Sequence, residues 1–108
     1  MKVVVSKSML PKGYLGITLC PFIVLKYKYL KSDAVFMNHE RIHLQQQLEL
    51  LILPFFIIYV MEFFLRLLFL RNWSQAYRSI SFEKEAYAND GNLDYLKSRP
   101  FWRFIKFI

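Results

Sequence analysis

Hydrophobic and polar positions alternate along the first third of the chain, which predicts strands there. Residues 22–29 alternate between apolar side chains and a partly polar face that carries Lys26 and Lys28. Residues 2–5 and 17–19 are further short apolar runs, separated by turn-forming proline and glycine. We expect these three segments to form a small antiparallel sheet.

Pro21 stands between two of these predicted strands. Proline cannot donate a hydrogen bond within a sheet, so its position indicates an edge strand or a bulge. An edge strand can receive an extended peptide by strand addition. The alternative is a sheet that merely covers the neighbouring helix, and the sequence leaves both interpretations open.

The middle of the chain predicts two long helices. Ser32 and Asp33 provide an N-cap for a helix that we expect to end near Leu53. Residues 50–70 are almost wholly apolar, and Pro54 is placed either to begin a second helix or to kink the first. This apolar stretch is long enough to cross a bilayer.

Two charged residues inside the apolar stretch restrict where it can lie. Glu62 and Arg66 are four residues apart, a spacing at which they can form an ion pair on one helix face. A charge in the bilayer core is costly, so a buried helix, an interfacial helical hairpin and a tilted span all compete. We favour a helix that is buried on one side and contacts lipid on the other.

The last third of the chain predicts shorter elements. Residues 71–80 are expected to form a loop and a short helix, and Ser81 is placed to N-cap a helix over 82–89 that stops before Gly91. A further short helix is expected over 93–98. The fold class predicted by all these elements is α+β, mainly α.

The composition adds a membrane surface to this picture. Of the 108 residues, 56% are hydrophobic and 19% aromatic, more than a core of this size can readily bury. The net charge is +7, and the basic residues are interleaved with aromatic and aliphatic ones, as in the tail at 101–108. This mixture favours an anionic membrane surface over nucleic acid, for which no recognised motif is present. The tail is therefore either an interfacial anchor or a segment docked on the domain.

The N-terminus does not have the pattern of a secretory signal, because the apolar run at 3–5 is short and Lys7 interrupts it. We therefore expect a membrane-associated protein on the cytoplasmic side, with a cytoplasmic protein as the alternative. The single Cys20 excludes an internal disulfide and a cysteine-rich structural zinc site.

An H-E-x-x-H motif at residues 39–43 contains the only two histidines of the chain. On a helix, residues four apart share a face, so His39 and His43 present two imidazoles side by side. This arrangement suits two corners of a tetrahedral Zn²⁺ site, with Glu40 as general base for a metal-bound water. Gln46 and Gln47 follow on the same face; they either orient a ligand or bind substrate, or they are solvated or satisfy nearby backbone groups.

A catalytic zinc site needs a third protein ligand, and no third histidine exists. Glu83 and Glu85 lie at the start of the helix predicted over 82–89, where the helix dipole favours carboxylates. Either glutamate would complete a His₂Glu site.

With these residues the chain resembles the gluzincin-type zinc metallopeptidases, in which the glutamate of a downstream Glu-x-x-Ala pattern completes the metal site. Residues 83–86 match that pattern with Glu83 as ligand, so the resemblance favours Glu83 over Glu85. It also implies a zincin-like core and the hydrolysis of a peptide or protein substrate. Small bacterial proteins with N-H-E-x-I-H, Gln-Gln and a later F-E-x-E-A-Y are similar over residues 38–47 and 82–87.

The implied reaction needs a second group to stabilise the oxyanion besides the metal. Tyr87 lies one turn beyond Glu83 and is our candidate, with Tyr77 and Arg78 behind it; each could instead be a packing or surface residue. Many related enzymes have Asp or Asn at the position of Tyr87. The expected single domain, 1–108, then consists of strands and turns at 1–31, the metal helix and hydrophobic helix at 33–70, the third-ligand helix at 81–99 and an aromatic-basic tail at 100–108.

Two other functional classes compete with a membrane-associated zinc metalloprotease. One is a non-catalytic zinc-binding or interaction module, a degenerate zincin whose apolar helix binds a membrane or a protein. Intact Glu40 favours the enzyme, since a module without catalysis has no need of a general base. The other is a basic, aromatic membrane-binding protein that holds no metal.

Overall fold

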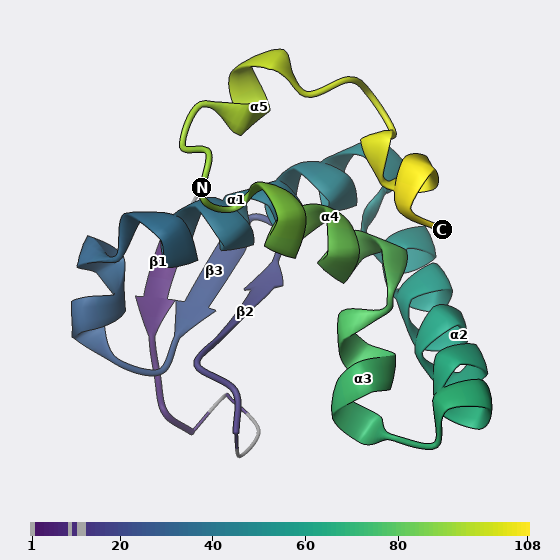
Figure 1. The fold of residues 1–108 in the computed structure, drawn as a ribbon. Helices are drawn as coiled ribbons and strands as arrows, with labels where there is room; N and C mark the ends of the chain where they lie inside the picture. Colours follow the sequence, from purple (N-terminus) through teal and green to yellow (C-terminus); the bar gives the residue numbers. More distant parts are fainter. Residues whose placement is uncertain (1, 9, 11–12) are drawn as a thin grey trace.

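A computed structural model describes residues 2–8, 10 and 13–108, and it is mainly helical with one small sheet (Figure 1). The mainly α, α+β class expected from the sequence is confirmed. In chain order the elements are β1 (Lys2–Val5), β2 (Gly16–Leu19), β3 (Phe22–Leu25), the 3₁₀ helix η1 (Lys28–Ser32), α1 (Ala34–Leu50), α2 (Ile52–Leu70), α3 (Trp73–Arg78), α4 (Ser81–Asn89), α5 (Tyr95–Ser98) and the 3₁₀ helix η2 (Arg103–Phe107).

The sheet is mixed and has the strand order β1-β3-β2. β2 and β3 form an antiparallel hairpin, and β1 pairs with β3 in parallel, so the expected antiparallel sheet is wrong for β1. β3 is central, and its residues Ile23, Val24 and Leu25 are buried. β2 is an edge strand, as Pro21 predicted.

The third predicted strand is shorter than expected, because it ends at Leu25 rather than at residue 29. The chain then turns into η1, whose Leu30 packs against Ile23, Leu25 and Met37 in one hydrophobic cluster. Burial of Leu30 against α1 thus overrides the local alternation of apolar and polar residues.

Helix α1 lies between the sheet and α4 (Figure 1). Asp33 caps its start, since the Asp33 carboxylate accepts a hydrogen bond of 3.0 Å from the Phe36 N–H. The helix ends at Leu50, earlier than expected, and Leu51 has a left-handed φ of 65°. Pro54 lies in the first turn of α2, where its missing N–H costs nothing, so a second helix begins there.

Helix α2 is the one helix among the described residues with the length and composition to cross a membrane, with a mean hydropathy of 2.1. Only 6% of that stretch is buried. The ion pair expected between Glu62 and Arg66 is not formed; Glu62 instead accepts hydrogen bonds from the backbone N–H and the hydroxyl of Ser81. The prediction that Ser81 is the N-cap is wrong: Ser81 is the first residue of α4, and Ile80 occupies the N-cap.

The C-terminal tail is docked at one residue and exposed at its neighbours. Phe104 of η2 is buried against Phe55 of α2 and Phe82 of α4. Phe101 and Ile105 are exposed on either side of it. The expectation of a docked segment is therefore confirmed at Phe104, and the interfacial anchor stays a prediction.

Candidate metal centre

Helices α1 and α4 bring three potential ligand atoms together. His39 and His43 project from α1, and their Nε2 atoms lie 3.2 Å apart. Glu83 projects from the first turn of α4, with its Oε1 atom 3.2 Å from His39 Nε2 and 3.1 Å from His43 Nε2. All three residues are buried, and they form a cluster that could hold a metal ion. Ligand atoms on a tetrahedral zinc ion are about 3.3–3.6 Å apart for bonds of about 2.0–2.2 Å, so these separations are close to those that such an ion requires.

The hydrogen bonds on the far side of each imidazole fix its tautomer. His39 Nδ1 lies 3.0 Å from Asp90 Oδ2, a carboxylate oxygen that can only accept. His43 Nδ1 lies 2.8 Å from Gln46 Oε1. The Gln46 amide nitrogen donates to two acceptors on α4, so its oxygen must face His43. Both histidines therefore carry a proton on Nδ1, which leaves Nε2 as the atom of each ring that would bind a metal ion.

Two lone pairs and a carboxylate oxygen at about 3 Å repel one another unless a cation lies between them. When no metal is bound, a proton can take the place of this cation. Burial opposes the protonation of His43, but the charge of Glu83, its hydrogen bond to His43 and the charge of Glu40 together outweigh burial and raise the pKa of His43 to about 9. Burial would likewise raise the pKa of Glu83, but His43 and the hydrogen bonds from both histidines hold it well below its usual value. The donor set, two imidazole nitrogens and one carboxylate, is one that Zn²⁺ commonly takes.

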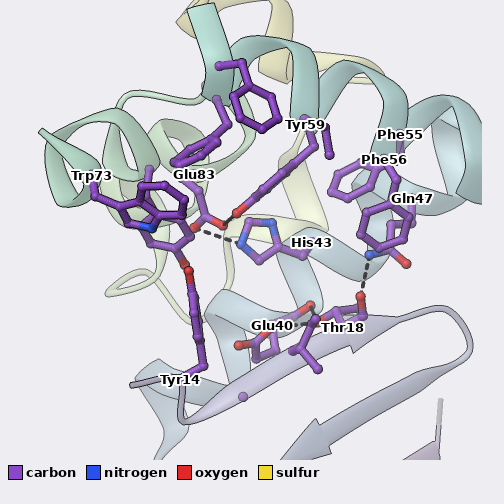
Figure 2. A pocket seen from close by; sticks show the side chains of 16 residues that line it. Tyr14, Thr18, Glu40, His43, Gln47, Phe55, Phe56, Tyr59, Trp73 and Glu83 are labelled. Atoms are coloured by element: carbon purple, nitrogen blue, oxygen red, sulfur yellow. Dashed lines mark hydrogen bonds and ion pairs between the residues drawn. The ribbon is translucent and has the colours of Figure 1, made fainter. Parts of the chain in front are cut away.

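Tyr59 of α2 completes the surroundings of Glu83. Its hydroxyl donates a hydrogen bond of 2.6 Å to Glu83 Oε2, the oxygen that does not face the histidines (Figure 2). Glu83 is thus oriented with one oxygen held by α2 and the other presented to His39 and His43. This is the kind of supporting contact that aligns a metal ligand.

Glu85, the other candidate for third ligand, lies outside the cluster. Its carboxylate is fully buried and accepts hydrogen bonds from Arg99, Tyr95 and Gln46. Burial would raise its pKa, but these contacts, led by that from Arg99, lower it. Glu85 therefore positions Gln46, which in turn orients His43.

Glu40 is held beside the cluster by the edge strand β2. The Thr18 hydroxyl lies 2.6 Å from Glu40 Oε2 and also 3.1 Å from the Glu40 carbonyl oxygen. Gly16 leaves room for Glu40, because a Cβ at residue 16 would lie 3.1 Å from Glu40 Oε1 and 2.6 Å from Phe36 Cζ. The carboxylate thus packs directly against the strand backbone.

Two cavities meet at Glu40. One, of about 450 Å³, is bordered by Glu40, His43 and Glu83 and is otherwise mostly apolar, with Phe55, Phe56 and other residues of α2 in its wall (Figure 2). The other, of about 680 Å³, is bordered by His39 and Glu40 and is more polar. The cluster is therefore accessible from both sides, and the first cavity is of the size that small ligands occupy.

The three residues considered for oxyanion stabilisation lie around the second cavity. The ring of Tyr87 packs edge-on against His39, with centroids 4.6 Å apart. The Arg78 guanidinium lies over the ring of Tyr87, 4.3 Å from its centroid. Tyr77 borders both cavities. Burial and the charge of Glu83 raise the pKa of Tyr87, so its hydroxyl stays protonated and can donate at neutral pH.

Several functional positions were not found from the sequence. Asp90 follows Glu83 by two helical turns, a spacing that could have placed it on the face of His39. Tyr59 and Thr18 come from other elements, and no local pattern marks them. Gln46 and Gln47 satisfy backbone groups near the site, one of the alternatives considered for them, because Gln46 donates to the Phe82 carbonyl and Gln47 binds β2. The solvated alternative is wrong, since both side chains are buried, and a role of Gln46 in orienting a metal ligand stays a prediction.

No protein-family model matches this chain, and no curated protein or solved structure matches it either.

Proposed function

We propose that this protein is a zinc-dependent, membrane-associated hydrolase of the gluzincin type, with His39, His43 and Glu83 as metal ligands. The observation that carries the proposal is the shared cavity: Glu40 and two of the three ligands border the same space of about 450 Å³. A purely structural zinc site is closed by a fourth protein ligand, whereas a catalytic one keeps a position for water or substrate.

Zinc bound here would polarise the substrate carbonyl and make hydroxide available near neutral pH. Glu40 is the general base: it takes a proton from the attacking water and delivers it to the nitrogen of the leaving amine as the C–N bond breaks. Thr18 holds the carboxylate of Glu40 through its hydroxyl, which leaves Glu40 Oε1 as the oxygen for proton transfer. Tyr87 and Tyr77 are the candidates for the donor to the carbonyl oxygen.

A peptide is the substrate that the surroundings favour. Gly16, Ile17 and Thr18 of the edge strand β2 border the cavity, and the free edge of such a strand pairs with extended peptide. The apolar wall from α2 would accommodate a large apolar side chain of the substrate. The same helix exposes apolar residues on its outer face, including Leu53, which is 70% exposed, and Leu68, also 70%. That face supports contact with lipid.

The test combines metal content with hydrolysis. Protein prepared without a metal-binding tag should contain close to one equivalent of zinc by elemental analysis and should cleave members of a quenched fluorescent peptide library. Glu40→Gln should retain zinc and lose about 10²–10⁴-fold in rate, as expected for removal of a general base. Asp94→Asn is the matched control, because Asp94 is exposed and pairs only with Lys97.

The outcomes separate the functional classes. Zinc without hydrolysis of any peptide would identify a non-catalytic zinc-binding module instead. A protein that takes up no zinc when it is supplied would overturn the proposal altogether.

A further inference from the structure

The edge of β2 that borders the cavity has a limited set of exposed backbone groups. In the hairpin, Ile17 lies opposite Val24, and the Lys26 N–H donates to the Leu15 carbonyl at 2.8 Å. Leu15 and Ile17 therefore direct their backbone groups towards β3, and Gly16 and Thr18 direct theirs to the opposite edge. Among the described residues no strand pairs with that edge.

Gln47 of α1 occupies one end of this edge. Its side-chain nitrogen donates to the Thr18 carbonyl at 2.7 Å, and its side-chain oxygen accepts from the Cys20 N–H at 2.7 Å. The side chain is 1% exposed, so its amide is held firmly in place (Figure 2). Gln47 thus satisfies two backbone groups that an added strand would otherwise use.

We propose that Gln47 is a specificity-determining residue that limits β2 to accepting a hydrogen bond from a single peptide N–H of the substrate. This inference rests on the proposed peptidase function. With the Thr18 carbonyl taken, the carbonyl of Gly16 is the one acceptor of β2 left on this edge for a peptide N–H. The N–H groups of Gly16 and Thr18 remain as donors to peptide carbonyls.

The peptide must leave the strand where Gln47 begins. Phe55 and Phe56 line the same cavity as Gln47 (Figure 2). The residue of the substrate that follows the paired one therefore enters an apolar space rather than a continued sheet. The substrate class is a peptide that has a large apolar residue directly after the residue paired with Gly16. Only a short stretch of its backbone pairs with β2.

The experiment measures binding, so that it does not depend on turnover. Fluorescently labelled peptides are titrated against zinc-loaded Glu40→Gln protein, and each peptide nitrogen is methylated in turn. Methylation at one backbone nitrogen should weaken binding about tenfold, as expected for one lost hydrogen bond that leaves the Gly16 carbonyl unsatisfied. Sensitivity at two alternate nitrogens would overturn the inference, because it would show pairing past Gln47.

A variant supplies the opposite prediction, a gain of binding. Gln47→Met removes the amide that binds the Thr18 carbonyl and the Cys20 N–H, and its flexible apolar side chain is no longer held against them, so peptides extended towards that end should bind about tenfold tighter while short ones are unchanged. A merely structural role would weaken all peptides equally and would contradict the proposal. Gln45→Met is the matched control, since Gln45 contacts Glu49 rather than β2.

The two proposals fail in different ways. Zinc-loaded protein that binds none of the peptides overturns both the peptidase function and the role of Gln47. Peptide binding with several sensitive nitrogens, or with no gain in Gln47→Met, overturns only the role of Gln47.

Discussion

The Nε2 atoms of His39 and His43 lie 3.2 Å apart, and Asp90 and Gln46 hold a proton on the opposite nitrogen of each ring. Two aligned lone pairs at this distance are stable only with a positive charge between them. The arrangement is thus prepared for a cation before one binds. Glu83 brings the compensating negative charge.

Glu83 and Glu85 should differ sharply when each is changed to glutamine. Glu83→Gln replaces the carboxylate oxygen at the cluster by a neutral amide, so we expect zinc affinity to fall by at least about 100-fold. Glu85→Gln changes a residue that contacts Gln46 but neither histidine, so it should cost about tenfold or less in zinc affinity. Competition with a chromogenic chelator measures both affinities. Equal losses in the two variants would contradict the assignment of Glu83 as the ligand.

The residues that orient the histidines should matter almost as much as the ligands. Gln46→Leu removes the acceptor for His43 Nδ1, and Asp90→Asn replaces the carboxylate that accepts from His39 Nδ1. Each should lower zinc affinity about 10- to 100-fold without changing the stoichiometry. Zinc titration followed by calorimetry provides the measurement, with Gln45→Leu as the control. An unchanged affinity in Gln46→Leu would mean that the His43 tautomer is set by something else.

The sequence predicts best what one helix encodes by itself. His39 and His43 are four residues apart on α1, so their meeting follows from helical geometry. The position of Glu83 followed from a resemblance and from the small number of other acidic residues. Its distance of 3.1 Å from His43 requires α4 to pack on α1, which no local pattern states.

The sequence fails where tertiary packing decides. Tyr59 reaches Glu83 from α2, and the relative placement of α2 and α4 depends on the cluster of Phe55, Phe82 and Phe104. The alternation over residues 22–29 is compatible with a longer strand, but burial of Leu30 against Met37 draws the chain into η1. The alternation of apolar and polar residues does not determine the residue at which the strand ends.

The pair of Glu85 and Arg99 should make stability depend on pH in a defined direction. Hydrogen bonds led by that from Arg99 lower the pKa of Glu85 in the folded state, although burial opposes this. A lowered folded-state pKa stabilises the fold above the unfolded-state value, about 4.3, and that contribution is lost as the pH falls further through the folded-state pKa. Glu85→Gln should therefore lower the free energy of unfolding by about 3–5 kcal/mol at pH 7, and by progressively less below about pH 4.

Urea denaturation of the zinc-free proteins across this pH range measures the difference. Asp94→Asn is the control, because the Asp94–Lys97 pair is exposed and should contribute less than about 1 kcal/mol at any pH. A difference between parent and Glu85→Gln that is constant from pH 7 to pH 3 would show that the Glu85 carboxylate does not carry the effect.

The outer face of α2 should govern binding to lipid. Leu53 and Leu68 are each 70% exposed, so changing both to aspartate leaves the core intact but removes apolar area from the face that would contact the membrane. Burial of one leucine contributes about 1.5–3 kcal/mol, so the double variant should bind vesicles at least about 100-fold more weakly. Co-sedimentation with vesicles of phosphatidylcholine and phosphatidylserine measures this. Leu93→Asp, at an exposed leucine outside α2, is the control. Equal binding by the parent and the double variant would exclude α2 as the lipid contact and leave the tail around Trp102 and Ile105 as the membrane-binding segment.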